Sequence, residues 1–204
     1  MSARECRLVA VEGSHAAGKT TLVHALVAHY QAQGLLVGCS EEPARTSPFM
    51  EDIVIHGQGE FDLVAEVDLF GAQLSEQLRS SRRLQLLICD KTVINVLAYA
   101  RLVLDGPPGS HTAGVLAAMA QFCAAWAPVY DAVFYCADRY HQDNDPMRAK
   151  VTHLQDAASQ AVLDTCTAAG VALHHVPTGF TVDQRVTWVV RHIDTLIHRP
   201  ASAH

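Results

Sequence analysis

A glycine-rich turn close to the first residues restricts the fold more than any other part of the sequence. The apolar run from Arg7 to Val11 is followed by Glu12 and then by Gly13-Ser14-His15-Ala16-Ala17-Gly18-Lys19-Thr20, which has the form G-x-x-x-x-G-K-T. Apolar residues then recur at helical spacing from Thr20 to Gln33, and Gly34 ends the segment. The pattern therefore predicts a buried strand, a tight loop and a helix in direct succession.

The residues of this loop favour binding of a nucleoside triphosphate. Gly13 and Gly18 permit backbone angles that turn successive N–H groups toward one anion, and the helix that follows adds its positive end. We expect Lys19 to reach the β and γ phosphates of ATP and the Thr20 hydroxyl to ligate Mg²⁺. The residues expected to bind the nucleotide are Gly13, Ser14, His15, Ala16, Ala17, Gly18, Lys19, Thr20 and Thr21.

The second expected part of the site is the strand from Gln85 to Cys89, which is followed by Asp90. In an open parallel sheet the carboxyl ends of the strands face the ligand, so Asp90 is expected to hold Mg²⁺ together with Thr20. Lys91 follows Asp90, whereas motor-type ATPases usually carry a catalytic glutamate there. The N-K-x-D element of guanine-specific switches is missing from the sequence. A small kinase is therefore favoured over a switch or a motor.

Short apolar runs alternate with segments of helical period, as in proteins built from strand–helix–strand units. Besides the two strands above, the expected strands are Leu35 to Cys39, Ala132 to Cys136 and Val171 to Val176. Besides the helix from Thr20, the expected helices are Phe61 to Ser80, Val93 to Leu104, Thr112 to Trp126, Val151 to Ala169 and Val182 to His198. Because crossovers of this kind join parallel strands, we expect an α/β fold with a five-stranded parallel sheet, helices on both faces, and one domain over residues 1–200.

The composition argues against several other classes of protein. The formal net charge is −6 and the sequence pI is about 6.0, whereas nucleic-acid surfaces need clustered Lys and Arg, so no nucleic acid is expected. No signal peptide is visible and no apolar run approaches the ~20 residues that cross a bilayer, so no membrane partner is expected. The six cysteines are scattered without C-x-x-C spacing, which predicts reduced thiols in a cytoplasmic protein. A homodimer, for example through the helix from Val93 to Leu104, is left open.

Further segments resemble small-molecule kinases. Val11-Glu12-Gly13 before Gly18-Lys19-Thr20-Thr21-Leu22 resembles the start of thymidylate kinases and their deoxynucleoside-kinase relatives, and Glu42-Pro43 resembles the Glu-Pro after their second strand. The segment from Asp90 to Tyr99 resembles the thymidylate-kinase segment that begins with Asp-Arg and ends in Leu-Ala-Tyr. Glu42-Pro43-Ala44-Arg45 is also similar to the Glu-x-x-Arg of the nicotinamide riboside kinase domain, of the same broad ATPase group. The resemblance implies a three-layer P-loop NTPase fold with the strand order 2-3-1-4-5.

The resemblance also implies roles for residues outside the phosphate loop. Glu42 would accept the proton of an attacking hydroxyl as a catalytic base, and Arg45 would clamp an acceptor or phosphoryl oxygen. Further contacts to the acceptor are expected from Phe70, Gln73, Lys91 and Tyr99. The alternative for Glu42 is a place in a solvated loop. For the aromatic and amide side chains, the alternative is a place in the core or on the surface.

A polar stretch after the fourth strand is expected to form a small lid around residues 138–152. Its cations would close over the phosphates and exclude water, with Arg148 as the catalytic candidate and Lys150 and Arg139 beside it. The alternative for this stretch is an exposed loop. Beyond the fifth strand, Pro177-Thr178-Gly179 would lie under the adenine ring. His15 would either contact the transferring phosphoryl group or face solvent.

The chain departs from the thymidylate kinase pattern at two positions. That family has an arginine before its Glu-Pro and another on the helix before the third strand, where this chain has Glu41 and Leu74. A phosphate acceptor needs cations, whereas a hydroxyl acceptor needs a carboxylate such as Glu42. We therefore expect transfer of the γ-phosphoryl group of Mg-ATP to a nucleoside or another alcohol, with Arg45 and Lys91 leaving a nucleoside monophosphate open. The alternative is a P-loop ATPase that acts as a regulatory or assembly module without a small-molecule acceptor.

Overall fold

The structure is a computed structural model of the chain, and it describes residues 6–13, 16–45, 47–53, 61–104, 106–140 and 155–197. The strands are β1 (Arg7–Glu12), β2 (Val37–Ser40), β3 (Leu86–Asp90), β4 (Ala132–Cys136) and β5 (Leu173–Val176). The longer helices are α1 (Lys19–Ala32), α3 (Leu63–Ser81), α4 (Val93–Val103), α5 (His111–Trp126), α7 (Gln155–Ala168) and α8 (Val182–Ile197). The short helices η1 (Pro43–Arg45), α2 (Pro48–Glu51) and η3 (Ala127–Val129) lie in the connections.

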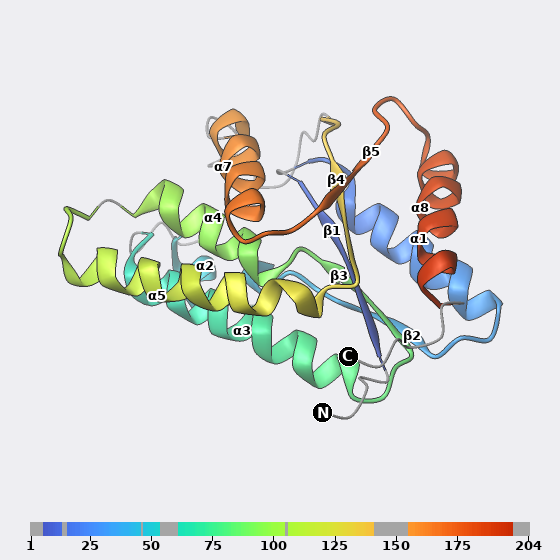
Figure 1. Cartoon of the computed structure of the whole chain (residues 1–204), viewed down its shortest axis with the longest axis horizontal. Coiled ribbons are helices and arrows are strands. Elements are labelled where there is room, and N and C mark those ends of the chain that lie inside the picture. Colours follow the sequence, from blue (N-terminus) through green and yellow to red (C-terminus); the bar gives the residue numbers. More distant parts are fainter. Residues whose placement is uncertain are drawn as a thin grey trace.

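The strands form one parallel sheet in the order β2-β3-β1-β4-β5, which confirms the expected architecture (Figure 1). In the register of the sheet, Val11 pairs with Asp90 and Ser40 pairs with Cys89. The carboxyl ends of β1, β2 and β3 therefore meet at one edge. From β1 the chain forms β2 and β3 on one side of this strand and then crosses to form β4 and β5 on the other side. Open α/β sheets bind ligands at such a switch point.

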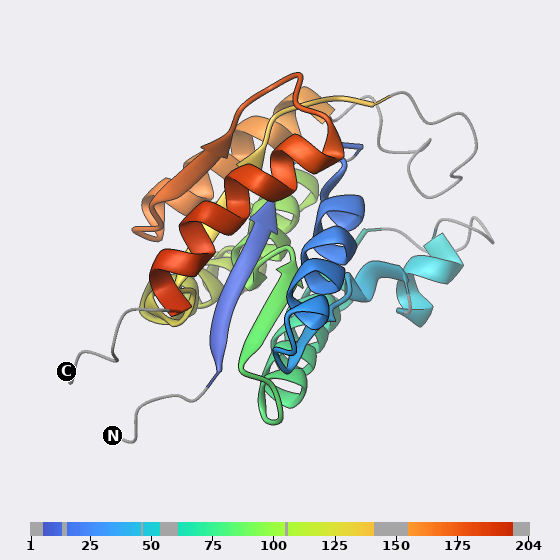
Figure 2. The ribbon, with the colours of Figure 1, turned by 90° about the vertical axis from the view of Figure 1, so that its right-hand side faces the viewer.

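Helices cover both faces of the sheet, and Figure 2 shows α1 and α8 side by side over one of them. Side chains alternate between the two faces along a strand, so Val9 and Val11 pack with α1 and α8, whereas Leu8 and Ala10 pack with α4, α5 and α7. Because both faces are covered, every residue of β3 is buried. This explains why the strand appears in the sequence as an uninterrupted apolar run.

The second strand, β2, starts later in the chain than its apolar pattern predicts, because local hydrogen bonds hold the residues before it. β2 begins at Val37 rather than at Leu35, because the Leu35 N–H donates to the Tyr30 carbonyl at 3.1 Å and so belongs to the end of α1. Gly34, at φ 83°, makes the turn that this bond requires. Leu36 is left 62% exposed in the connection, so apolar character alone misplaces the start of the strand.

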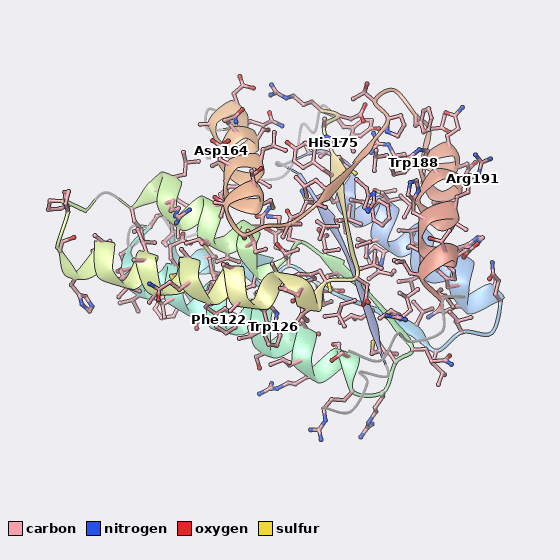
Figure 3. All side chains as sticks on the ribbon, in the orientation of Figure 1. Phe122, Trp126, Asp164, His175, Trp188 and Arg191 are labelled. Carbon is pink, nitrogen blue, oxygen red and sulfur yellow. The ribbon has the colours of Figure 1, made fainter. Side chains whose placement is uncertain are left out.

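The helix α5 continues into η3 as a long apolar segment. Residues His111–Val129 are long and apolar enough to cross a membrane by length and composition, with a hydropathy of 1.4, and 17% of that window is buried. The expectation that no apolar run approaches such a length was therefore too strict. Phe122 and Trp126 of α5 lie next to each other (Figure 3), and their stacked rings have centroids 5.5 Å apart. Phe122 also meets Phe70 of α3 edge-on, with ring centroids 5.6 Å apart. These aromatic contacts attach α5 to the helices on its face of the sheet.

The cysteines serve as packing side chains. All six are free thiols, and every one except the half-buried Cys39 is buried. Burial raises the pKa of Cys136 to about 11 and that of Cys123 to about 12. Both are therefore neutral at physiological pH and are poor metal ligands and nucleophiles there.

Candidate active site

The glycines of the phosphate loop occupy positions where a side chain does not fit. Gly13 has φ 140°, and a Cβ atom at this position would overlap a backbone carbonyl oxygen at the end of β4. Gly18 has φ 77° directly before α1, and a Cβ atom there would lie 2.9 Å from the ring of Tyr140. Ala16 also adopts a left-handed conformation, at φ 58°. These angles turn the chain sharply from β1 into α1, as the glycine spacing requires.

Lys19 is the first residue of α1 and is almost buried, with 7% of its surface exposed. Burial lowers the pKa of its ammonium group and the nearby Lys91 lowers it further, while the carboxylates of Asp90 and Glu42 act in the opposite direction. The loop therefore places a cation at the start of a helix, close to a second cation and two carboxylates.

Thr20 and Asp90 meet at the carboxyl end of the central strands. The Thr20 hydroxyl donates to Oδ2 of Asp90 at 2.6 Å, and Asp90 is 4% exposed. Its other oxygen, Oδ1, is buried and has no hydrogen-bond partner in the described part of the chain. Mg²⁺ is typically held by one or two hard oxygen ligands from the protein and keeps several waters. A hydroxyl and a carboxylate with an unpartnered oxygen fit this ion.

Lys91 has a left-handed backbone conformation, at φ 74°, although it is not a glycine. Its N–H donates to the Val11 carbonyl at 3.1 Å, and its own carbonyl accepts from the side-chain amides of Gln77 at 3.1 Å and Gln73 at 3.5 Å. Such a conformation costs on the order of 1–3 kcal/mol and persists where surrounding contacts hold it. The hydrogen bonds therefore fix the direction in which the Lys91 side chain leaves the sheet edge.

The Lys91 ammonium forms a salt bridge with the Glu42 carboxylate and lies 5.2 Å from the centroid of the Tyr99 ring. The Lys91 side chain is 6% exposed and that of Glu42 is 17% exposed. Burial alone would lower the pKa of Lys91, but Glu42 and Tyr99 outweigh it, so the pKa is raised and the lysine stays charged. A cation–carboxylate pair is thus built close to Lys19 from residues that are 49 positions apart.

The structure brings together several residues that the sequence assigned to the acceptor. Glu42, Lys91 and Tyr99 form one contact group, and Gln73 joins it through the Lys91 carbonyl. Phe70 is on the same helix as Gln73, but its ring packs against α5 through Phe122. Its role in binding a base stays a prediction, as do the roles of the other four.

Some predicted site residues lie outside the part of the chain that the structure describes. They are Ser14, His15, Arg148, Lys150 and the side chain of Arg45. Arg139, the remaining lid cation, is exposed and forms a salt bridge with Asp156 of α7. The catalytic roles expected of these cations therefore stay predictions.

A fully buried carboxylate directly before the phosphate loop was not expected as a site residue. Glu12 is 0% exposed and accepts from the N–H and hydroxyl of Thr92 at 2.7 and 2.6 Å and from the Asn95 amide at 2.6 Å. Burial raises the pKa of Glu12, and these hydrogen bonds oppose the rise. Since Thr92 caps α4, Glu12 joins the end of β1 to the start of α4 and holds the backbone next to Lys91. Its signal in the sequence is a carboxylate at the end of an apolar strand.

We expect Glu12→Ala to lower the free energy of unfolding by about 3 kcal/mol or more, because three buried donors would lose their acceptor and each costs about 1–3 kcal/mol. Denaturant unfolding at neutral pH measures the change. The control is Glu41→Ala at an exposed position, where surface substitutions usually alter stability by less than about 0.5 kcal/mol. Equal stabilities of the two variants would show that the Glu12 cluster does not hold β1 and α4 together.

Arg185 of α8 contacts the phosphate loop and connects segments that are far apart in the sequence. It is 2% exposed, donates to the Ala17 carbonyl at 3.0 Å and forms a salt bridge with Asp138 at 2.6 Å. Asp138 also accepts from the N–H of Gly179 at 2.8 Å, and Arg185 hydrogen-bonds the Tyr140 hydroxyl. One buried guanidinium therefore joins the phosphate loop, the start of the expected lid and the expected adenine loop. No local pattern marks this arginine, because its partner in the loop is 168 positions away.

Comparison with protein families finds a match that covers most of the chain. A family model described as AAA domain matches residues 8–185, from β1 to Arg185. Comparison with curated proteins finds no match.

Several solved structures match nearly the whole chain. NadR in complex with NAD and AMP-PNP has a TM-score of 0.66 at 16% identity, covering 98% of this chain and 52% of that one, so this chain spans about half the length of NadR. Thymidylate kinase from Candida albicans has a TM-score of 0.67 at 18% identity, covering 96% and 94%. Deoxyadenosine kinase from M. mycoides with bound dATP has a TM-score of 0.57 at 13% identity, covering 92% and 99%. At these identities the similarity establishes a shared fold.

Proposed function

Because the chain belongs to the AAA domain family and has the fold of P-loop kinases, we propose that it transfers the γ-phosphoryl group of ATP to a nucleoside or a nucleoside monophosphate-like small molecule. The observation that carries the proposal is the buried pair of Lys91 and Glu42 close to Lys19. A phosphate-binding loop alone suits any ATPase. A carboxylate held in a fixed position beside that loop suits an enzyme that also activates an acceptor. We also propose that the chain forms one domain and that the residues around 138–152 form a small lid.

The loop residues would bind and orient ATP. The N–H groups between Gly13 and Thr20 would surround the phosphates, and Lys19 would stabilise the charge on the oxygens of the transferring phosphoryl group. Thr20 and Asp90 would hold Mg²⁺, which when bound neutralises charge on the β and γ phosphate oxygens. Arg185 would keep the loop in shape through the Ala17 carbonyl.

In the transfer step, the acceptor hydroxyl oxygen forms a bond to the γ-phosphorus as the bond to the bridging oxygen of the β-phosphate breaks, and ADP leaves with that oxygen. Glu42 takes the proton of the hydroxyl. The salt bridge with Lys91 would hold the Glu42 carboxylate in a fixed position until the acceptor arrives. As Glu42 turns to the acceptor, Lys91 is in a position to balance charge on the phosphoryl oxygens.

The test is a screen for acceptor-dependent ADP release. Nucleosides, nucleoside monophosphates and nicotinamide riboside are each added to the protein with Mg-ATP, and Lys19→Ala serves as the blank. We expect at least one compound to raise ADP release above the water background and to yield a phosphorylated product by mass spectrometry. If none does, the kinase proposal is wrong. Steady ATP hydrolysis that no compound stimulates would instead favour a regulatory or assembly module.

A further inference from the structure

The first turns of α3 extend past the carboxyl edge of the sheet. α3 has 19 residues and is ~28 Å long, whereas β3 has 5 residues and spans ~17 Å. The helix leads into β3 from the edge at which Glu42 and Asp90 lie, because crossover helices run antiparallel to the strands of a parallel sheet. Gln73 and Gln77 bond to the Lys91 carbonyl and so are level with this edge. The residues before Gln73 therefore lie beyond the edge.

Glu66 is on the same buried face of α3 as Gln73 and precedes it by seven positions, or ~10 Å along the helix. Glu66 is 3% exposed, and its Oε2 atom is buried without a hydrogen-bond partner in the described residues. The side-chain oxygen of Gln73, which is 0% exposed, is also buried and unpartnered, while its nitrogen faces the Lys91 carbonyl. Two buried hydrogen-bond acceptors on one helix face therefore have no donor from the described chain.

Such an arrangement is costly in a folded protein, because each buried polar atom without a partner loses its hydration. Burial and, to a smaller extent, Asp62 at the N-cap of α3 together raise the pKa of Glu66 to about 7, against the lowering effect of Lys91. Ala65 and Leu69 of this turn belong to an apolar cluster, and its other members are uncharged: Met50, Ile53, Ala44, Phe61 and Val96. A carboxyl group with a shifted pKa and no partner, next to a site, is typical of a group that a ligand completes.

We propose that Glu66 determines which acceptor is used, by accepting a hydrogen bond from an N–H group of a heterocycle at the end remote from the transferred phosphoryl group, while Gln73 keeps the acceptor-binding role that the sequence assigns to it. The inference rests on the proposed kinase function. Both oxygens are acceptors, so a ring that offers only acceptors at this edge would leave them unpaired. A ring with amino or amide N–H groups would pair them. The span between the two residues is comparable to the length of a nucleoside, so Gln73 serves the part nearer to Lys91 and Glu66 the outer part.

The first test compares acceptors that differ in one N–H group, with the unaltered protein. The matched pairs are adenosine with purine riboside, cytidine with 2-pyrimidinone riboside, uridine with N3-methyluridine, and nicotinamide riboside with the pyridinium riboside that lacks the carboxamide. For whichever acceptor is phosphorylated, we expect kcat/KM to fall by about 10- to 100-fold in the partner without the N–H group, as for a buried acceptor left unsatisfied. Equal kcat/KM values within every active pair would overturn the inference.

The second test uses Glu66→Gln, with Glu76→Gln on the same helix as its control. We expect Glu66→Gln to raise KM for the N–H-bearing acceptor about tenfold, because the glutamine oxygen still accepts the hydrogen bond but lacks the charge that strengthens it, and to leave KM for ATP unchanged. In the unaltered protein the acceptor KM should fall as pH rises through about 7 and then level off, because the ionised form of Glu66 is the one that accepts. Glu66→Gln should remove this pH dependence, and Glu76→Gln should keep it.

The outcomes separate this inference from the kinase proposal. If no compound is phosphorylated, both are wrong. If an acceptor is phosphorylated but Glu66→Gln keeps the acceptor KM, its pH profile and the discrimination within the matched pair, only the role of Glu66 is wrong. A purely structural Glu66 would alter stability without changing that discrimination.

Discussion

Replacing Lys19 with alanine is expected to lower kcat/KM for ATP by about 10³-fold, similar to the loss of a main charge-stabilising donor in other enzymes. Lys19 is the cation of the phosphate loop, and it lies close to the carboxylates of Asp90 and Glu42. Its pKa is lowered by burial and by Lys91, so a bound polyphosphate would stabilise its charged form. Without it, the phosphate loop has no ammonium group to balance the charge on the transferring phosphoryl oxygens.

The measurement is ATP turnover with the best acceptor, together with ATP affinity by calorimetry. His24→Ala is the matched control, because His24 is exposed on the same helix. It is expected to behave like the unaltered protein. If Lys19→Ala kept most of the activity and affinity, the loop would not be the ATP site.

The substitution Glu42→Gln is expected to lower kcat by about 10²- to 10⁴-fold, the usual contribution of a general base, while KM for ATP changes little. Glutamine preserves the size of the side chain but does not take a proton from the acceptor hydroxyl. The measurement is acceptor-dependent ADP release at saturating ATP. An ATPase that acts only as a regulatory module would bind and hydrolyse ATP as before.

Glu42→Gln also breaks the salt bridge with Lys91, so a loss of stability must be separated from a loss of catalysis. Removing one partner of a buried ion pair typically costs about 3–5 kcal/mol of stability, because the other charge is left unpaired. The double variant Glu42→Gln/Lys91→Met removes both charges and is expected to recover much of that stability. If kcat of Glu42→Gln is low under conditions in which this variant is fully folded, Glu42 acts in the reaction. If Glu42→Gln alone turns over at the rate of the unaltered protein, the carboxylate is only the structural partner of Lys91.

Most of the fold and the geometry of the glycine-rich loop could be predicted from contiguous residues. The shape of the G-x-x-x-x-G-K-T turn follows from its own residues, because Gly13 and Gly18 stand at the positions where a Cβ atom would clash. Asp90 could be placed because a parallel sheet brings the carboxyl ends of its strands together. The start of β2 was missed because the bond from Leu35 to Tyr30 competes with the apolar pattern.

The residues that complete the site are less visible in the sequence. The ion pair of Lys91 and Glu42 joins segments 49 positions apart, and the Glu12 cluster spans 80 positions or more. Arg185 reaches the phosphate loop from the last helix. A resemblance to kinases pointed to Glu42 and Lys91 separately, but it did not indicate that each is the partner of the other.

The amino-acid sequence alone determined the layered α/β fold, the strand order through the kinase resemblance, and the position of the phosphate loop. These depend on the periodicity of apolar residues and on the backbone freedom of glycine, which act over short stretches of chain. Only the tertiary structure decided which buried charges are paired and which buried carboxylate oxygens, such as Oε2 of Glu66, have no hydrogen-bond partner among the residues that the structure describes. The physical reason is that burial and pairing depend on the packing of whole helices and strands, so residues with the same local pattern acquire different partners and different pKa values.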